Sequence, residues 1–501
     1  MAPNLSWQSG APIEIPSRAS PPSHPIWFRH QTPLKCTAEE STLITTSIQL
    51  SPPSPSPHEL NLDVVRVAHG WSGPPPAVEH AVFAYEVPGS ESDIDVWLSQ
   101  VVVHGRSRLL EANGDIEKAV DTLMHDLCKA HPLKTPFFLV HYIPAASPAG
   151  KHALLFSFNH AVFDTAGSFQ IMDLCVSRIA DALATGGERS PLPWGEETSR
   201  LTPAFVESAR IPHTADKIPE DEFMVQRVKD VAQTLSTAHT LPGPRFKPSP
   251  SSTGAFMRTA SPDCPLVCLL CVLTTLRTTA RQNAATLSSL LMATASLSCI
   301  RLRPPVDTAN VTLPFLQSPV NGRSLACTDP DDRSQWSVRI SMGFNSYATR
   351  DLGRFVRSSS DDSRQLIEDV WVLAREVRKQ TEEQKRHIER MPVWGDDVLA
   401  AIEQAFSDES IKSSGWSPVL SSIGVVDAYL ARSHAVATGG ELNVSSPLLR
   451  PTYPPSFVGC SYGSAEDQAI ALKEGRNDDA IGLQFVNEFM YILDVIAQSA
   501  Q

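Results

Sequence analysis

The sequence of 501 residues has no long hydrophobic run and no excess of positive charge, and each absence excludes a class of function. Its longest apolar stretch, around residues 265–273, is much shorter than the roughly 20 residues that span a bilayer, so we expect no membrane span. There are 42 Lys and Arg against 55 Asp and Glu, a net charge of −13. Because binding to a phosphate backbone requires clustered Lys and Arg, we expect no nucleic-acid partner.

The two ends of the sequence carry no targeting signal that we recognise. The first residues lack a charged region followed by an apolar core, which a secretory signal peptide requires. The final Gln-Ser-Ala-Gln matches no peroxisomal or retention tripeptide. We therefore expect a cytoplasmic protein.

The nine cysteines form neither a disulfide pattern nor a metal-ligand pattern. Their number is odd and they are scattered, which does not indicate a disulfide framework. Cys264, Cys268 and Cys271 share one helical face, but zinc needs further ligands nearby and no histidine lies between residues 240 and 386. We predict that these three cysteines are buried as small hydrophobic side chains and that the protein holds no metal.

Proline is unusually frequent, with 41 prolines against 25 glycines, the reverse of the usual order. A hydrophobic content of 42% is enough for a folded core, so the prolines mark boundaries rather than general disorder. They concentrate before residue 60 and again in a linker over residues 241–254. We predict a Pro/Ser-rich N-terminal arm over residues 1–60 and two α+β halves over residues 61–245 and 246–501.

Strand-like and helix-like segments alternate in both predicted halves. Residues 64–67 and 137–142 are apolar runs typical of strands. Asp115 is placed to cap a helix whose apolar side chains recur at helical spacing from Ile116 to Leu127. Further helical patterns lie within residues 287–295, 366–377 and 485–496.

The most informative segment joins a predicted strand to a predicted helix. Residues 153–158 form an apolar run, and His160 follows at its end. A turn with Asp164 and Gly167 then leads into an amphipathic helix beginning near Ser168. An imidazole at the end of a buried strand has a fixed backbone, and its ordinary pKa near 6.5 suits proton transfer at neutral pH.

The spacing of His160 and Asp164 is not specific by itself. With 15 histidines, on the order of one such pair is expected by chance. One interpretation is therefore a hydrogen-bonded histidine at a strand end with no catalytic role. The other is a proton-transfer group, with Asp164 bracing the loop through backbone N–H groups or an arginine.

In this context the chain resembles the chloramphenicol-acetyltransferase-like acyltransferase superfamily, whose motif is H-x-x-x-D-G. The sequence here runs from His160 through Asp164 to Gly167, so that the glycine comes two positions late. Residues 319–325 resemble the short N/D-x-R segment of that family, and residues 340–345 resemble the glycine-containing strand that follows it.

Two further features place the resemblance within the superfamily. Residues 421–430 are similar to a strand of fungal trichothecene O-acetyltransferase-like proteins. The D-F-G-W-G signature of the plant branch is absent, and Asn159 stands where condensation domains carry the first of two histidines. The resemblance therefore favours the fungal branch.

The resemblance implies an α+β, two-lobed chloramphenicol-acetyltransferase-like fold, with two mixed-sheet halves and a tunnel between them. It implies that His160 is the general base and that Asp164 completes the catalytic motif. Arg323 is implied as the partner of Asp164 and, with Gly167, as structural support. Three polar residues are expected to line the site: Asn345, Ser421 and Ser422.

The implied reaction is transfer of an acyl group, in the first place acetyl, from coenzyme A to a hydroxyl of a secondary metabolite such as a terpenoid. Acyl-CoA would be a co-substrate, and no permanently bound cofactor is expected. The expected partners are thus a small-molecule alcohol and acyl-CoA, and we expect a monomer.

Three alternatives remain. Residues 459–463 match the G-x-S-x-G nucleophile motif of α/β-hydrolases, but the last histidine, His434, precedes Ser461, the wrong order for that fold. A second alternative is a catalytically silent relative that acts as a binding or scaffold protein. The third is a condensation-like enzyme that takes acyl groups from a carrier protein.

Overall fold

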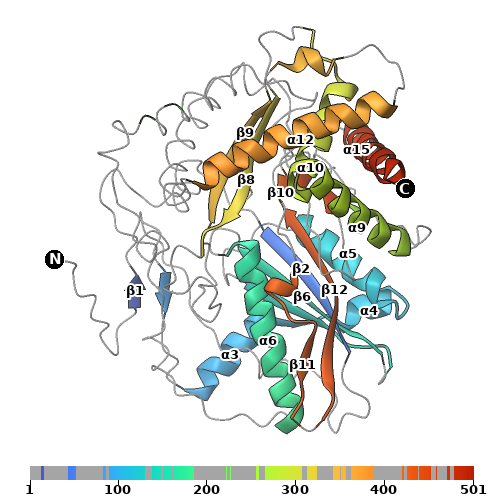
Figure 1. Ribbon diagram of the computed structural model, residues 1–501. Helices are drawn as coiled ribbons and strands as arrows, with labels where there is room; N and C mark the ends of the chain where they lie inside the picture. Colours follow the sequence, from blue (N-terminus) through green and yellow to red (C-terminus); the bar gives the residue numbers. More distant parts are fainter. Residues whose placement is uncertain are drawn as a thin grey trace, which may run out of the picture. The chain divides into compact units, whose positions relative to one another are not determined.

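The chain divides into two compact units (Figure 1). The computed structural model describes residues 13–15, 43–51, 83–85, 90–129, 138–147, 150–159, 163–185, 222, 226, 256–258, 266–306, 313–323, 342–349, 351–356, 363–386, 420–421, 426–437, 439–452, 458–459, 471–473 and 479–500. Unit 1 comprises residues 1–210, 323–341 and 426–452, and unit 2 comprises residues 211–322, 342–425 and 453–501. Each unit therefore contains segments from distant parts of the sequence.

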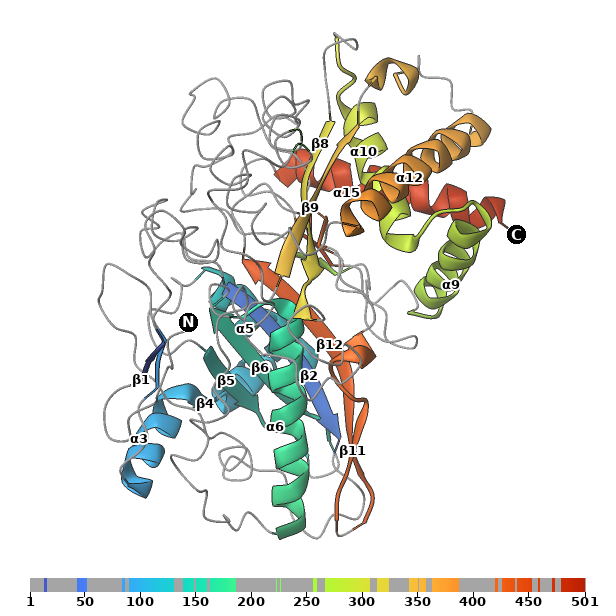
Figure 2. The ribbon, with the colours of Figure 1, turned by 60° about the vertical axis from the view of Figure 1, so that its left-hand side comes forward.

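Unit 1 is built on a six-stranded sheet in the order β11-β12-β2-β6-β5-β4 (Figures 1 and 2). Neighbouring strands are antiparallel except β4 and β5, which are parallel. The strands are β2 (Leu43–Ser51), β4 (Val102–His104), β5 (Phe138–Ile143), β6 (His152–Asn159), β11 (Ser433–Ala435) and β12 (Glu441–Thr452). The strand that leads to His160, β6, is thus paired on both sides.

Helices cover the two faces of this sheet. On one face, Ile143, Ala153 and Leu155 pack with apolar residues of α4 (Arg106–Glu111) and α5 (Ile116–Lys129). The other face carries α6 (Thr165–Thr185), which lies along the sheet in both views (Figures 1 and 2). Unit 1 also contains α3 (Glu91–Val101) and the pair of β1 (Ile13–Ile15) with β3 (Phe83–Tyr85).

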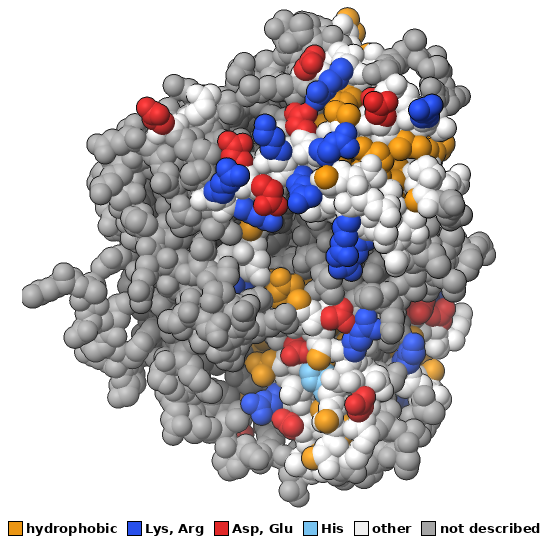
Figure 3. All heavy atoms as spheres, viewed as in Figure 1, with side chains coloured by type: hydrophobic (Ala, Val, Ile, Leu, Met, Phe, Trp, Pro, Cys, Tyr) orange, Lys and Arg blue, Asp and Glu red, His pale blue; other side chains and the backbone are white. Residues whose placement is uncertain are grey.

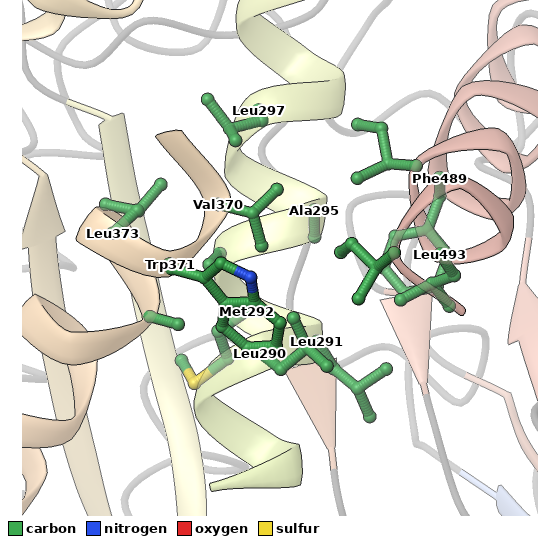
Figure 4. Packing of buried hydrophobic residues seen from close by; sticks show 14 of the residues in the cluster. Leu290, Leu291, Met292, Ala295, Leu297, Val370, Trp371, Leu373, Phe489 and Leu493 are labelled. Carbon is green, nitrogen blue, oxygen red and sulfur yellow. The ribbon is translucent and has the colours of Figure 1, made fainter. Parts of the chain in front are cut away.

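Unit 2 has a helical core around α10 (Leu287–Leu302). Every residue of α10 from Ser289 to Ile300 is buried, because α9 (Leu266–Gln282), α12 (Ser363–Lys385) and α15 (Asp479–Ser499) pack around it. Figure 4 shows part of this core: Leu290, Leu291, Met292, Ala295, Leu297, Val370, Trp371, Leu373, Phe489 and Leu493.

The strands that the structure describes in unit 2 form three pairs. The longest pair is β8 (Leu313–Asn321) with β9 (Met342–Thr349), which is antiparallel. A second antiparallel pair joins β7 (Phe256–Arg258) to β14 (Ala471–Lys473). The third pair, β10 (Leu420–Ser421) with β13 (Val458–Gly459), is parallel. Short 3₁₀ helices are η4 (Leu352–Arg354) in unit 2 and η6 (Val426–Ala428) in unit 1.

Within the described residues, no single helix has the length and apolar composition to cross a membrane. Only Thr274–Gln282 of α9 and Leu287–Leu302 of α10 reach that length and composition as a pair, and they are bent by 94°. Figure 3 shows basic and acidic side chains interleaved over the described part of one face, where no continuous basic patch is visible. The expectation that no nucleic acid binds stays a prediction.

Several predicted elements are confirmed. The predicted strand at residues 137–142 is β5, and the three helices predicted near residues 287, 366 and 485 are α10, α12 and α15. Asp115 caps α5 as expected, since its Oδ1 accepts hydrogen bonds from the N–H groups of Glu117 and Lys118. Residues 64–67 and 241–254, Cys264, and the side chains of Cys268 and Cys271 lie outside the described residues.

Other boundaries differ from the sequence-based expectation. The segment predicted to be an N-terminal arm contains β2, which is a central strand of the sheet because β6 and β12 pair with it on either side. The two units also interleave: residues 211–245 belong to unit 2, whereas residues 323–341 and 426–452 return to unit 1. Within residues 421–430, expected to be one strand, β10 ends at Ser421 and η6 occupies Val426–Ala428.

Two buried histidines on the central strands make the stability of unit 1 depend on pH. Burial lowers the pKa of His141 from 6.5 to about 4, with a further contribution from the Arg108 cation, and burial alone lowers that of His152 to about 4. The unfolded chain therefore binds more protons between pH 6.5 and 4. Their contribution to stability is fully present above pH 6.5 and is lost as the pH falls toward 4.

For each of the two histidines, we expect the free energy of unfolding to fall by about 2 kcal/mol when the pH is lowered from 7.5 to 5. Urea titrations at the two pH values, on wild type and on His141→Leu, measure this directly. The variant should lose about 2 kcal/mol less than wild type on acidification. His104→Gln, which replaces an exposed histidine, should keep the wild-type dependence. An unchanged pH dependence in His141→Leu would show that His141 does not fold as the neutral imidazole.

Candidate active site

The structure fixes the chain on both sides of His160. Strand β6 is buried from His152 to Phe158 and ends at Asn159, opposite Leu43 of β2. His160 itself lies outside the described residues, as do residues 161 and 162, and the description resumes at Phe163. The structure therefore describes the chain up to one residue before His160 and again from three residues after it.

An aromatic cluster holds Phe163, the first described residue after His160. The Phe163 side chain is 1% exposed. Its ring packs edge-on against Phe158 at 5.4 Å and against Phe138 at 6.4 Å between centroids. Edge-to-face pairs contribute about 0.5–1.5 kcal/mol beyond the burial of their apolar area. Phe163, three positions after His160, is thus anchored to β6 and to its neighbouring strand β5.

Asp164 caps the helix that follows. Its Oδ1 accepts a hydrogen bond from the N–H of Gly167 at 2.8 Å. Its backbone carbonyl accepts from both the N–H and the hydroxyl of Ser168 at 2.9 Å. Helix α6 consequently begins at Thr165, earlier than the predicted start near Ser168.

This helix start explains how the chain tolerates the late glycine. Thr165 is the first residue of α6. It occupies the position directly after the aspartate, where the motif of the family that the chain resembles has glycine. Among the described non-glycine residues, a positive φ occurs at Asn113, Ala284 and Asp351, so Thr165 needs no glycine-like backbone. Gly167 supplies a backbone N–H to Asp164, a donor that any residue except proline can provide.

Arg323 and Asp164 form a buried ion pair, as the resemblance implied. The Arg323 Nη2 lies 2.7 Å from Oδ1 and Nη1 lies 2.9 Å from Oδ2, a two-point fork between residues 159 positions apart. The Arg323 side chain is 1% exposed and that of Asp164 is 6% exposed. Removing two ions from water costs several kcal/mol per ion, which only such geometry and added hydrogen bonds offset.

The pair fixes what Asp164 can do chemically. Both carboxylate oxygens accept from Arg323, and one also accepts from Gly167. The carboxylate is therefore committed to holding the start of α6 and is not open to take a proton from a substrate. His160 is the titratable residue nearest to Asp164 in the sequence.

The expected lining residues lie on unit 2. Asn345 is in β9 opposite Ser318, and Ser421 is in β10 opposite Gly459 of β13. The side chains of Asn345 and Ser421, and all of Ser422, lie outside the described residues. Their participation in the site stays a prediction. The structure does not test the hydrolase alternative either, because Ser461 lies outside the described residues.

The part of the chain that the structure describes holds no group of three or more His, Cys, Asp and Glu side chains able to bind a metal ion. One long-range polar contact of α6 is not predictable from the sequence. Asp173, on the same helix that Asp164 caps, accepts a hydrogen bond from the backbone of Ala431. No local pattern signals a contact between residues 258 positions apart.

Comparisons with known proteins agree with this architecture at the level of the fold. No family model and no curated sequence matches the chain. Solved structures do match over nearly its whole length, and they share the fold of acyltransferases and condensation domains. The mixed helix-and-sheet class predicted from the sequence is thereby confirmed.

Three of these structures are informative. TRI3 trichothecene 15-O-acetyltransferase from Fusarium sporotrichioides matches with a TM-score of 0.72 at 13% identity, over 97% of this chain and 96% of the other. The first condensation domain of the calcium-dependent antibiotic synthetase, in complex with a substrate analogue, has a TM-score of 0.57 at 12% identity and covers 98% and 97%. The starter condensation domain of rhizomide synthetase, in complex with C8-CoA, has a TM-score of 0.53 at 11% identity and covers 92% and 90%. Identities this low show the fold alone.

Proposed function

We propose that this protein is an O-acyltransferase that moves an acyl group, in the first place acetyl, from coenzyme A to a hydroxyl group of a secondary metabolite. One observation carries the proposal. The buried strand β6 ends one residue before His160, and the buried pair of Asp164 and Arg323 holds the first turn of the helix that begins at Thr165. The likeness to a trichothecene acetyltransferase supports an alcohol, such as a terpenoid, as acceptor.

In the proposed reaction His160 acts as general base. It takes the proton of the acceptor hydroxyl while the oxygen attacks the thioester carbonyl, so that the new C–O bond forms. The C–S bond then breaks and the proton passes to the departing thiolate of coenzyme A. No acyl-enzyme forms, and the only co-substrate is acyl-CoA, with no resident cofactor.

The developing oxyanion needs a fixed hydrogen-bond donor. Asn345, Ser421 and Ser422 are the proposed donors. Asp164 and Arg323 act indirectly, because they hold the start of α6, which follows His160 in the sequence. We further propose that the enzyme works in the cytoplasm as a monomer.

Two other functions fit the same fold. Condensation domains are among the similar structures, which favours acyl transfer from a carrier protein as the second candidate. One of them is in complex with C8-CoA, which keeps free acyl-CoA as the first candidate donor. A catalytically silent binding protein is the third possibility.

One assay separates these functions. The purified full chain is incubated with acetyl-CoA and a panel of terpenoid alcohols, and thiol release and ester formation are followed together. We expect ester and thiol in equal amounts with at least one alcohol. Transfer from a carrier-bound thioester but not from acetyl-CoA would favour the condensation-like enzyme. If neither donor supports transfer and calorimetry detects no coenzyme A binding, the result would favour the catalytically silent binding protein.

A further inference from the structure

Two buried polar side chains of unit 1 have no hydrogen-bond partner. Ser157 of β6 is 0% exposed and His141 of β5 is 8% exposed. Within the part of the chain that the structure describes, neither the Ser157 Oγ nor the His141 Nε2 makes a hydrogen bond. Buried polar atoms are nearly always paired, with protein or with ordered water, because an unpaired atom loses its hydration without compensation. A partner for these two atoms is therefore expected.

Both side chains lie on the face of the sheet that α4 and α5 cover. Successive residues of a strand face opposite sides, so His141 shares a face with Ile143, and Ser157 shares a face with Leu155. Ile143 and Leu155 pack with apolar residues of α4 and α5. This is the face opposite α6 (Figures 1 and 2). The two polar groups are thus separate from the polar contacts of the candidate active site.

The strand register makes the two side chains neighbours. His141 pairs with Leu155 and Ser157 pairs with Leu139, so Ser157 and His141 are diagonal neighbours on adjacent antiparallel strands. Such residues lie about 7–8 Å apart, and their Cβ atoms are somewhat closer. One water molecule joins polar atoms up to about 5.6 Å apart through two hydrogen bonds of about 2.8 Å. It can therefore bridge two side chains at this spacing that do not bond to each other.

The chemistry of the pair favours a neutral ligand. Burial, with a further contribution from the Arg108 cation, lowers the pKa of His141 to about 4, so the imidazole is uncharged at pH 7. Arg108 itself pairs with Glu111 and Asp126. An ion held only by a hydroxyl and a neutral imidazole would be buried without a counter-charge, which is strongly unfavourable. Water both donates and accepts, so it matches a hydroxyl and either tautomer of the imidazole.

We propose that Ser157 and His141 bind one structural water molecule between the sheet and the helices α4 and α5. Two polar partners are enough to hold a buried water. The water connects β5 to β6 through their side chains, in addition to the backbone hydrogen bonds of the pair. The proposal goes beyond acyl transfer and does not depend on it, because the site lies wholly within unit 1 and needs no substrate.

A high-resolution crystal structure of the full wild-type chain tests the site directly. We expect the density of one water oxygen about 2.7–3.2 Å from both the Ser157 Oγ and the His141 Nε2. A direct hydrogen bond between these two atoms, or the absence of density between them, would overturn the proposal. This measurement needs no variant, so it decides the question even where a substitution prevents folding.

A double-mutant cycle tests the same site in solution, with amide hydrogen exchange of β6 as the readout. In the wild-type background, Ser157→Ala should speed the exchange by about threefold to tenfold, because the water loses an anchor and the imidazole loses its partner. In the His141→Leu background the same substitution should change the exchange by less than about twofold, because the bridge is already broken. Equal effects in both backgrounds would show that no water couples the two side chains.

The matched control removes another buried serine hydroxyl. Ser298 of α10 is buried in unit 2 and donates to the Thr294 carbonyl at 2.8 Å. Ser298→Ala should change the exchange of β6 by less than about twofold in both backgrounds, since distant sites act independently. A response of β6 to Ser298→Ala as large as that to Ser157→Ala would show that the effect is general, and would count against a water at Ser157.

Discussion

Replacing His160 with alanine is expected to lower kcat for acetyl transfer by about 10² to 10⁴-fold, the usual contribution of a general base. At about 1.4 kcal/mol per factor of ten, this corresponds to about 3 to 5.5 kcal/mol of transition-state stabilisation. Asp164 cannot take over the role, because Arg323 and Gly167 occupy its carboxylate. The measurement is steady-state kinetics with the acceptor alcohol identified in the panel assay.

Two controls show whether the loss is chemical. His160→Gln keeps a polar side chain of similar size but cannot accept and return a proton at neutral pH, so it should be as inactive as the alanine variant. His104→Ala removes an exposed histidine of the same unit and should retain full activity. Activity in His160→Ala within about threefold of wild type would remove His160 from the mechanism.

The elements around the site could be predicted from the sequence because their signals are local. Strand β6 is mainly apolar from Ala153 to Phe158, as expected for a strand paired on both sides and covered on both faces. The cap of α5 was predictable from Asp115 alone. The pattern predicts a start of α6 near Ser168, which is too late because the Asp164 side chain caps the helix and lets it begin at Thr165.

The role of β2 could not be predicted from composition. The neighbouring prolines and serines gave residues 1–60 the character of an irregular arm. Leu43–Ser51 nevertheless alternates enough apolar and β-branched side chains to form a strand, and its partners β6 and β12 lie about 100 and 400 residues further on. Strand pairing between residues so far apart cannot be recognised from a short stretch of sequence.

The interleaving of the two units has the same cause. Nothing near residues 323 or 426 indicates that the chain returns to unit 1. Arg323 pairs with Asp164 at the start of α6, and the Ala431 N–H bonds to Asp173 of α6, so both partners lie in a distant part of the sequence. Arg323 was found only through the resemblance to a known family. Ala431, whose contact is made through its backbone, offered no side-chain signal at all.

Arg323→Ala is expected to lower the free energy of unfolding by about 3 to 5 kcal/mol, because it leaves the Asp164 carboxylate buried without its counter-charge. Both side chains are almost completely buried, so water cannot replace the lost partner without opening the structure. Urea titration of the full chain at pH 7.5 measures the change. A loss of less than about 1 kcal/mol would show that the carboxylate reaches solvent or another cation.

A double variant tests whether the charge or the contact matters. Asp164→Asn keeps an oxygen that accepts from the Gly167 N–H, and asparagine caps helices about as well as aspartate. Combined with Arg323→Met, it removes both charges and fills much of the space of the arginine stem. We expect this pair to regain most of the stability that Arg323→Ala loses, because no buried charge is left unpaired. Arg178→Ala, which breaks an exposed pair on the same helix, should change stability by less than about 0.5 kcal/mol.

The same double variant then separates two roles of the ion pair. If the pair only holds the first turn of α6, the stable double variant should retain kcat within about threefold of wild type, since His160 is untouched and the cap is preserved. If the field of the pair tunes the imidazole, kcat should fall and the pH dependence of kcat/KM should shift while the protein remains folded. Because both oxygens of Asp164 face Arg323 in a neutral, closed pair, we expect the first result.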